Sequence, residues 1–380
     1  MQYDYIILGG GASGLSLAHR MANNVWFQDK KIAVVEKTRK ETNDRTWSFW
    51  EDAPGPYESI IHKSWTQLMF HSDTLSKKLD IAPFTYKMVR GLDFYNYVYK
   101  ELDRVKNIDM VYDEIHHVEE LEDLVNVKTK SGRTLIGKHV FKSYPSVNID
   151  REKHLYVAQH FKGYFINTTN EVFNSDQAVF MDFRIDQKGE ARFLYVLPES
   201  SNKALVEVAI FSNNILNQSD YDQILTDYID KYIKPDDYSI EEEEFGIIPM
   251  TTYPFHKHNS KLITNIGTAG GIVKSSSGYA FRRIQQHSDQ LVKCIISGRP
   301  MSESYKGLMG RYAMYDKTML HAMLKGGVAG DSIFTSLFGK KKASKIMKFL
   351  NHDTSLLEEF DIFTAPPWWP FTKAFFKELV

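Results

Sequence analysis

A glycine-rich loop near the start of the chain has the residue types and the spacing that bind a pyrophosphate. It reads Gly9-Gly10-Gly11-Ala12-Ser13-Gly14 and fits the pattern G-x-G-x-x-G. The first glycine permits a tight turn, Gly11 lets the backbone approach an anion because it has no Cβ atom, and Gly14 allows a helix to pack closely on a strand. A helix that begins here offers free N–H groups and a partial positive charge. The loop therefore predicts a dinucleotide site.

The segments around this loop supply the context that the pattern needs. An apolar strand is expected over residues 3–8, a helix over 14–23 and a second buried strand over 31–36, which ends at Glu36. An acidic side chain at that place binds the ribose hydroxyls of a dinucleotide. The strand–helix–strand order predicts a parallel pair and therefore a Rossmann-like α/β domain.

Two further segments favour FAD over NAD. Arg45 lies in the polar stretch Asn43-Asp44-Arg45-Thr46-Trp47-Ser48, where flavoproteins place contacts to the diphosphate. A second glycine cluster, Gly267-Thr268-Ala269-Gly270-Gly271, follows another apolar strand. Flavoproteins of the hydroxylase and reductase group bring such a late loop to the flavin, and most of them carry Asp where this chain has Thr268. The alternative is that the second cluster is an ordinary strand–helix turn.

The composition bounds the class of protein. The 380 residues exceed what one core usually supports, and the net charge of -1 gives no reason to expect nucleic-acid binding. The one cysteine, Cys294, excludes an internal disulfide and a multi-cysteine metal site, and we expect no metal. No signal peptide or transmembrane run is apparent, so we expect a cytoplasmic protein, either free or peripheral to the cytoplasmic membrane.

The remaining sequence divides into three kinds of segment. Short alternating runs over residues 155–212 predict an antiparallel sheet, and the four glutamates at 241–244 are interpreted as a solvated face or an edge strand. Helices are expected over 93–106, 219–233 and 279–297. The predicted domains are a composite FAD-binding domain (1–75, 86–150 and 255–300), an antiparallel substrate-binding sheet (155–250) and a helical C-terminal lobe (301–380).

A set of ordered motifs resembles the lycopene cyclase family of flavoproteins, of the bacterial soluble or peripheral type. The resemblance runs nearly end to end. The motifs are Arg45-Thr46-Trp47-Ser48-Phe49-Trp50, Tyr86 with Arg90-Gly91 and Phe94, Gln159-His160-Phe161 with Gly163, Met181-Asp182-Phe183-Arg184, Phe193-Leu194-Tyr195-Val196-Leu197-Pro198, Leu205-Val206-Glu207, Phe245-Gly246-Ile247-Ile248-Pro249-Met250, and Gly270-Gly271 with Ser276-Ser277-Gly278-Tyr279-Ala280-Phe281.

This resemblance implies a fold, a cofactor and a reaction. The fold is the FAD-binding architecture of the glutathione-reductase and hydroxylase type, with an antiparallel substrate domain and a C-terminal helical region. The reaction is the redox-neutral cyclisation of the ψ-ends of lycopene to β-ionone rings, which uses reduced FAD and electrons from NAD(P)H. The implied cofactor contacts are Gly9, Gly11, Ala12, Ser13, Gly14, Glu36, Lys37, Arg45, Val118, Gly267, Gly270, Gly271, Lys274 and Gly278.

The implied chemistry requires an acid strong enough to protonate an alkene, and burial in an apolar pocket keeps a carboxyl group protonated near neutral pH. Glu207 is the leading candidate because it interrupts an apolar strand, Ala204-Leu205-Val206-Glu207-Val208-Ala209. The family carries an acidic residue here and commonly a hydroxyl two positions later, where this chain has Ala209. The alternative is that Glu207 faces the polar side of a half-buried strand.

Three more residues are candidates for the same reaction, each with a structural alternative. Asp182 could take part in catalysis or could only hold Arg184 in an ion pair. His160 could relay a proton, although a lone histidine among aromatic residues usually serves packing. Lys274, beside the second glycine cluster, could stabilise an anionic reduced flavin or could simply be exposed.

The C-terminal region predicts contact with a lipid surface. Residues 334–350 contain Lys340, Lys341, Lys342, Lys345 and Lys348 and no acidic residue, and the chain ends in an aromatic stretch that includes Trp368 and Trp369. Basic charge beside Trp and Phe suits an interfacial anchor for an enzyme that draws its substrate from a bilayer. The alternative is a helical lobe that packs its aromatic residues on the main body.

Two other functions of the whole protein remain as alternatives. One is a flavin-dependent monooxygenase or prenyl reductase acting on another isoprenoid, and the other is a non-catalytic carotenoid-binding protein.

Overall fold

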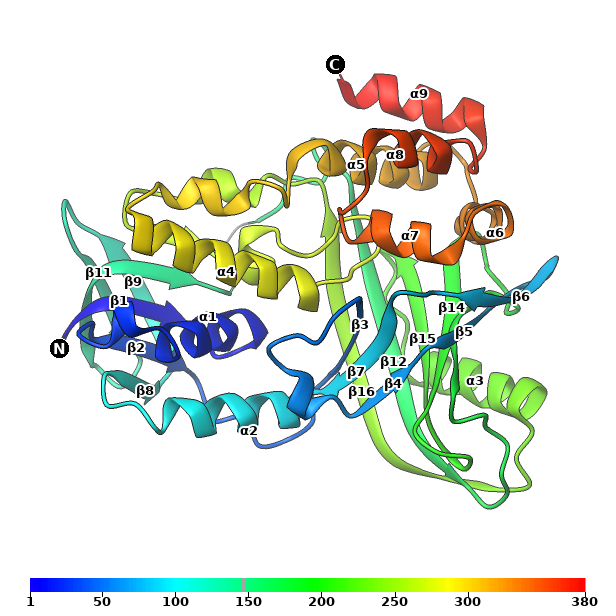
Figure 1. Cartoon of the computed structure of the whole chain (residues 1–380), viewed down its shortest axis with the longest axis horizontal. Helices are drawn as coiled ribbons and strands as arrows, with labels where there is room; N and C mark the ends of the chain where they lie inside the picture. The colour runs from blue at the N-terminus through cyan, green and yellow to red at the C-terminus, as the bar shows by residue number, and fades with distance from the viewer. Residues whose placement is uncertain (145–147, 380) are drawn as a thin grey trace. The chain divides into compact units, whose positions relative to one another are not determined.

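The computed structural model describes residues 1–144 and 148–379 and divides into two compact units, each built from three stretches of the chain (Figure 1). Unit 1 comprises Met1–Asn43, Gly91–His154 and Thr252–Ala313, and unit 2 comprises Asp44–Arg90, Leu155–Thr251 and Met314–Val380. Residues 44–75 and 86–90, which the sequence assigns to the nucleotide-binding domain, belong to unit 2. The reason is that their strands pair with one another and with the large sheet of that unit.

The sheet of unit 1 is mostly parallel at its centre. Its order is β8 (Ile108–Tyr112), β2 (Ile32–Glu36), β1 (Gln2–Leu8), β11 (Thr134–Lys142), β10 (Val125–Thr129) and β9 (Ile115–Glu120), and β17 (Ile263–Asn265) pairs with β11. Strand β1 is parallel to β2 and β11, and β17 is parallel to β11, so the carboxyl ends of these strands meet at one edge. Both glycine clusters follow strands that end at this edge, which is where doubly wound folds bind ligands.

Three α-helices and four short helices complete the described part of unit 1. The α-helices are α1 (Ala12–Ala22), α2 (Gly91–Leu102) and α4 (Phe281–Ser297), and the short helices are η1 (Val25–Phe27), η4 (Phe255–His258), η5 (Gly267–Gly270) and η6 (Met301–Tyr305). Helix α4 ends where the sequence predicts, because Gly298 adopts a left-handed conformation with φ of 64°. Arg20 ties α1 to α4, since its Nε lies 2.5 Å from Asp289 Oδ1.

The large sheet of unit 2 confirms the antiparallel reading of residues 155–212. Its order is β16 (Tyr238–Thr251), β12 (Tyr156–Thr168), β15 (Lys203–Ser212), β14 (Ala191–Pro198), β13 (Gln177–Asp182), β5 (Gln67–Ser72) and β6 (Leu75–Asp80). Neighbours are antiparallel except for β13 and β5. Strand β16, which carries the four glutamates, is an edge strand, as one of the two sequence interpretations expects.

The two faces of this sheet have different neighbours. Helix α3 (Gln218–Tyr228), which continues into η3 (Ile229–Ile233), packs on the face that carries Val206, Val208 and Ile210 (Figure 1). Side chains alternate along a strand, so Leu205, Glu207 and Ala209 lie on the other face. Leu205 and Ala209 are buried there, which excludes the reading that Glu207 lies on an ordinary solvated face.

A small antiparallel sheet and five helices complete unit 2. The small sheet has the order β3 (Thr46–Glu51), β7 (Thr85–Arg90) and β4 (Lys63–Trp65), with η2 (Glu58–Ile60) between β3 and β4 in sequence. The helices are α5 (Gly310–Leu324), which begins in unit 1, α6 (Gly330–Lys340), α7 (Ala343–Leu350), α8 (Leu356–Phe363) and α9 (Trp368–Leu379). Figure 1 shows α9 beside α8 at the outer side of the helical layer.

Candidate functional site

The first glycine loop has the shape of a pyrophosphate cradle. Gly11 is the N-cap residue of α1 and has no side-chain capping bond, so backbone N–H groups remain at the helix start. A Cβ atom on Gly14 would come 1.9 Å from the carbonyl oxygen of Gly9, whereas one on Gly11 would meet nothing within 4 Å. Gly14 is therefore required for packing. Gly11 borders open space in which an anion can approach the backbone.

Glu36 is held at the edge of this cradle. Its Oε2 accepts a hydrogen bond from the backbone N–H of Gly10 (2.5 Å), and its Oε1 accepts one from the backbone N–H of Lys37 (3.1 Å). The carboxylate thus stands at the carboxyl end of β2, where a ribose would lie. The side chain of Lys37 pairs with Glu114 (3.4 Å) and is exposed.

The second glycine cluster lies against the first. Gly267 has φ of 60°, and a Cβ atom there would come 2.8 Å from Cβ of Ser13. Gly270 is equally constrained, because its Cβ would lie 2.5 Å from the carbonyl oxygen of Asn265. The structure therefore brings residues 9–14 and 267–271 together. This contact favours a shared cofactor site over an ordinary strand–helix turn.

The other predicted cofactor residues lie in different surroundings. Lys274 is 2% exposed, so the alternative of simple exposure is wrong. Its carbonyl accepts a hydrogen bond from Gly278 (2.8 Å), which has φ of 72°. Val118 packs into the core of the unit 1 sheet, in a cluster with Val35 and Val111. Arg45 belongs to unit 2 and pairs with Asp44 (3.4 Å), and its contact with a cofactor stays a prediction.

Unit 2 contains a pair of carboxyl groups that border one glycine. Gly163 of β12 lies opposite Glu207 of β15 on one side and opposite Glu244 of β16 on the other. A Cβ atom on Gly163 would lie 3.2 Å from Cβ of Glu207 and 3.3 Å from Cγ of Glu244. The absence of a side chain on the central strand therefore leaves the space over which the two glutamates approach each other.

The electrostatic surroundings differ for the two carboxyl groups. Burial raises the pKa of Glu207 well above its ordinary value, and the negative charge of Glu244 raises it further. Burial also raises the pKa of Glu244, but hydrogen bonds with Glu207 and Thr46, and then the positive charge of Arg90, act in the opposite direction. Glu244 is 4% exposed, whereas Glu207 keeps a partly accessible surface. Glu207 is therefore the half of the pair with the more strongly raised pKa and with accessible surface.

Aromatic side chains border Glu207. Tyr195 of β14 lies directly opposite Glu207 in the strand register. Its ring centroid is 5.2 Å from that of Phe193 and 6.3 Å from that of Phe180, and Phe180 in turn contacts Tyr86 at 5.4 Å. These rings are buried. A cation that formed beside Glu207 would face aromatic rings and a carboxylate, both of which stabilise positive charge.

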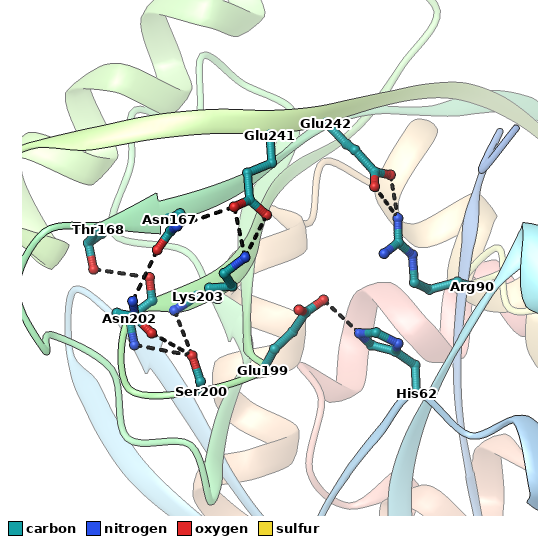
Figure 2. Close-up of polar contacts among 10 residues, drawn as sticks. All are labelled: His62, Arg90, Asn167, Thr168, Glu199, Ser200, Asn202, Lys203, Glu241 and Glu242. Atoms are coloured by element: carbon teal, nitrogen blue, oxygen red, sulfur yellow. Dashed lines mark hydrogen bonds and ion pairs between the residues drawn. The ribbon is translucent and has the colours of Figure 1, made fainter.

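The polar residues around this pair fix the strands that carry it. Figure 2 shows that Glu241 binds Lys203 (2.8 Å) and that Glu242 binds Arg90. In the turn between β14 and β15, the backbone N–H of Lys203 donates to Ser200 Oγ (3.1 Å). Glu243 pairs with Lys162 (3.1 Å). The four glutamates thus have four different environments, and the interpretation of 241–244 as a solvated face is wrong for Glu244.

Asp182 has the contacts of a structural ion pair. It is fully buried, and its carboxylate accepts hydrogen bonds from Arg184 Nε (2.9 Å) and from the hydroxyl of Tyr228 (2.7 Å). Burial acts to raise the pKa of Asp182, but the hydrogen bonds from Arg184 outweigh it and the pKa is lowered. An ionised carboxylate cannot donate a proton, so of the two readings of Asp182 the structure favours the ion pair.

His160 does not lie beside Glu207. It is three residues from Gly163 on β12, so its side chain points to the opposite face of the sheet. There His160 Nδ1 lies 2.5 Å from the hydroxyl of Tyr221 on α3, and its ring is fully buried. Burial lowers the pKa of His160. The predicted proton relay is therefore wrong for this geometry, and His160 serves packing against α3.

Sequence reasoning missed Glu244 and the role of Gly163. Glu244 is the fourth glutamate of an acidic run, which is the usual signature of a solvated segment. Its burial follows from the pairing of β16 with β12, a long-range contact that no local pattern reveals. The one available signal is Gly163 itself, because an isolated glycine inside a strand indicates close approach of neighbouring groups.

Residues 1–144 and 148–379 offer neither a metal-binding cluster nor a membrane-spanning helix. These residues include no group of three or more His, Cys, Asp or Glu side chains that could hold a metal ion. No helix in the described part of the chain is long and apolar enough to span a membrane.

Comparisons with known proteins agree with this architecture. Neoxanthin synthase from Solanum tuberosum is 24% identical over 326 residues, and that from Solanum lycopersicum is 24% identical over 324. Each alignment covers 80% of this chain and 63% of the relative, so the chain spans less than two thirds of the length of these relatives.

Solved structures show the same fold at low identity. A geranylgeranyl bacteriochlorophyll reductase-like protein from Thermoplasma acidophilum has a TM-score of 0.71 and 14% identity, with 100% of this chain and 99% of that chain covered. A flavoprotein/dehydrogenase from Cytophaga hutchinsonii has a TM-score of 0.65 and 11% identity, with both chains fully covered. The predicted Rossmann-like flavoprotein fold with an antiparallel second domain and C-terminal helices is confirmed. A family model described as lycopene cyclase protein matches residues 4–375, so the chain belongs to the lycopene cyclase family.

Proposed function

We propose that this protein is a lycopene β-cyclase, which closes the acyclic ends of lycopene into β-ionone rings without net oxidation or reduction. Membership of the lycopene cyclase family supports an enzyme that modifies carotenoids. The observation that carries the finer assignment is Glu207, a partly accessible carboxyl group whose pKa is raised well above its ordinary value by desolvation within the sheet and by the neighbouring Glu244. Such a group remains protonated near neutral pH and can act as a general acid.

The residues of unit 2 account for each requirement of the reaction. Glu207 would give its proton to the terminal double bond of the substrate, and the resulting cation would close onto the inner double bond. Tyr195 and the neighbouring rings would stabilise the cation and exclude water, which would otherwise capture it as an alcohol. Loss of a ring proton to a carboxylate completes the product, so that the numbers of protons and electrons are unchanged.

The glycine-rich residues of unit 1 fit FAD. The open space at Gly11 suits the diphosphate, Glu36 suits the adenosine ribose, and the loop at Gly267 lies against the first loop. FAD in its reduced form, with electrons from NAD(P)H, would supply negative charge and electron density for a cationic reaction. Lys274 is a candidate to hold that charge, since it is a buried cation next to the second glycine cluster.

An assay with defined products tests the proposal. The FAD-loaded protein is incubated with lycopene in liposomes and NADPH without oxygen, and we expect γ- and then β-carotene. Glu207→Gln should retain FAD and lose about 10²-fold or more of the rate, because it removes the general acid and preserves the shape. Unchanged lycopene with FAD-loaded, reduced protein would refute the proposal. Net consumption of NAD(P)H or oxygen in step with product would instead indicate a reductase or a monooxygenase.

We also propose that the protein associates peripherally with the cytoplasmic membrane, although three of the five lysines that the sequence suggests are paired within the protein. Lys341 and Lys345 pair with Asp361 of α8 (2.7 and 2.5 Å), and Lys348 pairs with Glu358 (2.8 Å). Lys340 donates to the carbonyl of Ala365 (3.0 Å). Lys341, Lys345 and Lys348 thus pair with acidic residues of α8, and Lys340 joins the end of α6 to the segment after α8.

The same ion pairs engage two acidic residues of α8, Glu358 and Asp361. Its third acidic residue, Glu359, is buried and accepts a hydrogen bond from Tyr315 (2.9 Å). The large apolar side chains that α8 and α9 expose are Leu356, Leu357, Phe360, Trp368, Trp369 and Phe376, each between 63% and 85% exposed. We call this set the α8–α9 face. Aromatic and aliphatic side chains of this kind suit shallow insertion at a lipid interface.

Flotation with lipid vesicles tests this surface. Wild-type protein should float with zwitterionic vesicles, and Leu357→Ser with Phe360→Ser should reduce the bound fraction severalfold. Leu121→Ser, at an exposed leucine of unit 1, serves as the control and should bind as the wild type does. Binding that is unaffected by the double change would refute the proposal. A shift from dimer to monomer in the double variant would show that the face joins two copies of the chain instead.

A further inference from the structure

We propose that Glu207 and Glu244 act as a dyad that holds a single proton above Gly163, with Glu244 as the ionised half that Arg90 fixes in place. The inference rests on the proposed acid chemistry and extends it to a second residue. It explains how one site could both supply a proton to a double bond and remove one from the ring that forms.

The geometry of the sheet supports the pair independently of any titration. Three adjacent strands, β15, β12 and β16, place Glu207, Gly163 and Glu244 in one row. A residue with a side chain at position 163 would fill the space between them, since even a methyl group would lie within 3.3 Å of both glutamates. Next to this row, a Cβ on Gly246 would lie 2.4 Å from the Phe161 ring, so that ring covers Gly246. The row is therefore bounded by apolar atoms on the β16 side.

The charged groups around the pair favour one negative charge. On this face β16 contributes Glu242 as well as Glu244, β7 contributes Arg90, β14 contributes Tyr195, and β12 contributes no charged group beside Gly163. Arg90 binds Glu242 and lies over the ring of Phe165 at 5.1 Å. One guanidinium therefore serves two glutamates, Glu242 and Glu244, so the site lacks the positive charge that a second buried carboxylate at Glu207 would need. Two carboxyl groups this close share one proton.

Burial assigns the roles within the pair. Glu244 is nearly inaccessible, and its carboxyl group is hydrogen-bonded to Glu207 and to Thr46. Glu207 retains an accessible part and faces Tyr195. Glu207 is then the catalytic residue, and Glu244 is a positioning residue that keeps the proton on its partner.

The proton balance of the cycle closes within the dyad. Before the reaction Glu207 is protonated and Glu244 is ionised. The O–H bond of Glu207 breaks as a C–H bond forms on the terminal alkene carbon, which leaves two carboxylates opposite a carbocation. After the carbon–carbon bond of the ring forms, a ring C–H bond breaks, its electrons form the new double bond, and the proton returns to the dyad. Neither water nor a redox partner is consumed.

Infrared titration of the FAD-loaded protein without substrate tests the dyad directly. We expect wild type to show the C=O stretch of one protonated carboxyl group at neutral pH, and Glu207→Gln to lose that band. In Glu244→Gln the band should persist but titrate at lower pH, because the like charge that raises the pKa of Glu207 is gone. Glu243→Gln is the matched control, since Glu243 is the neighbouring residue, points to the other face and pairs with Lys162.

Kinetics provide the second readout. A general acid must be protonated, so activity falls as pH rises through its pKa, and Glu244→Gln should move this alkaline limb to lower pH while Glu243→Gln leaves it in place. Glu244→Asp should restore part of the shift. The dyad would be overturned if Glu244→Gln moved neither the alkaline limb of the pH–activity profile nor the infrared titration of the carboxyl band. Normal infrared behaviour with no conversion of lycopene would uphold the dyad and refute the proposed function instead.

Discussion

Replacing Gly163 by alanine tests whether the gap above this residue holds the two carboxyl groups together. The added methyl group would lie 2.9 Å from Leu205 Cδ1, 3.2 Å from Glu207 Cβ and 3.3 Å from Glu244 Cγ, all closer than ordinary contacts. Overpacking of this kind typically costs about 1–3 kcal/mol, of which the lower chain entropy of unfolded alanine offsets about 0.5–1 kcal/mol. We therefore expect the free energy of unfolding to fall by roughly 1–2 kcal/mol. The methyl group should also force the carboxyl groups apart.

The assay combines chemical denaturation with the pH dependence of lycopene cyclisation. Separation weakens the repulsion that raises the pKa of Glu207, so the alkaline limb should move to lower pH. Gly137→Ala is the matched control, because its methyl group would lie 2.8 Å from Ile6 Cδ1 in a strand of unit 1 with no carboxyl group among its close contacts. Both variants should lose stability, and only Gly163→Ala should shift the limb. An equal shift in both variants, or in neither, would refute the reasoning.

Three further predictions follow from the described contacts. Gly14→Ala should abolish FAD binding, measured by flavin absorbance of the purified protein, because its methyl group would lie 1.9 Å from the carbonyl oxygen of Gly9. Asp182→Asn should lower the free energy of unfolding by about 2–3 kcal/mol in denaturant titrations at pH 7, since it weakens charge-assisted hydrogen bonds with Arg184. Glu207→Gln should unfold at a higher temperature than wild type at pH 8, with a smaller difference at pH 4. The pKa of Glu207 is raised in the folded protein, so the free energy of unfolding of wild type falls as pH rises above the pKa of this group in the unfolded chain. The amide of the variant does not titrate, and the variant therefore escapes this loss.

The parts of the fold that sequence predicts best are those in which local pattern and packing agree. The strand before Gly9, the helix after it and the stop at Gly298 each depend on a few neighbouring residues, and each appears where expected. The fold of residues 44–90 is harder to predict from the sequence. Strands β3 to β7 in this segment include short strands separated by turns, and β5 joins the large sheet only by pairing with the distant β13. Partners so far apart in sequence leave no periodic signal in either strand.

The residues of the candidate site show the same contrast between local patterns and long-range pairing. Glu207 is visible in the sequence because a charge inside an apolar strand is locally anomalous. The faces on which His160 and Glu244 lie depend instead on strand register, which the sequence alone does not reveal. Register places Glu244 in one row with Glu207 through Gly163, and strand alternation puts His160 on the face of α3. A shift of one residue between β12 and β16 would move every glutamate of the acidic run to the opposite face and would remove Glu244 from the row with Glu207.

The alternation of β15 explains how a destabilising residue persists in the middle of this sheet. Val206 and Val208, on either side of Glu207, point to the other face and pack against Tyr221 and Leu225 of α3. The strand therefore has enough buried contacts, on the α3 face and through Leu205 and Ala209 on the other, to carry a costly carboxyl group. Burial of a carboxyl group with no dedicated cation weakens the folded state at neutral and higher pH, as the raised pKa of Glu207 implies. Glutamine at this position would satisfy the sheet at lower cost, which supports the proposal that the carboxyl group of Glu207 serves chemistry.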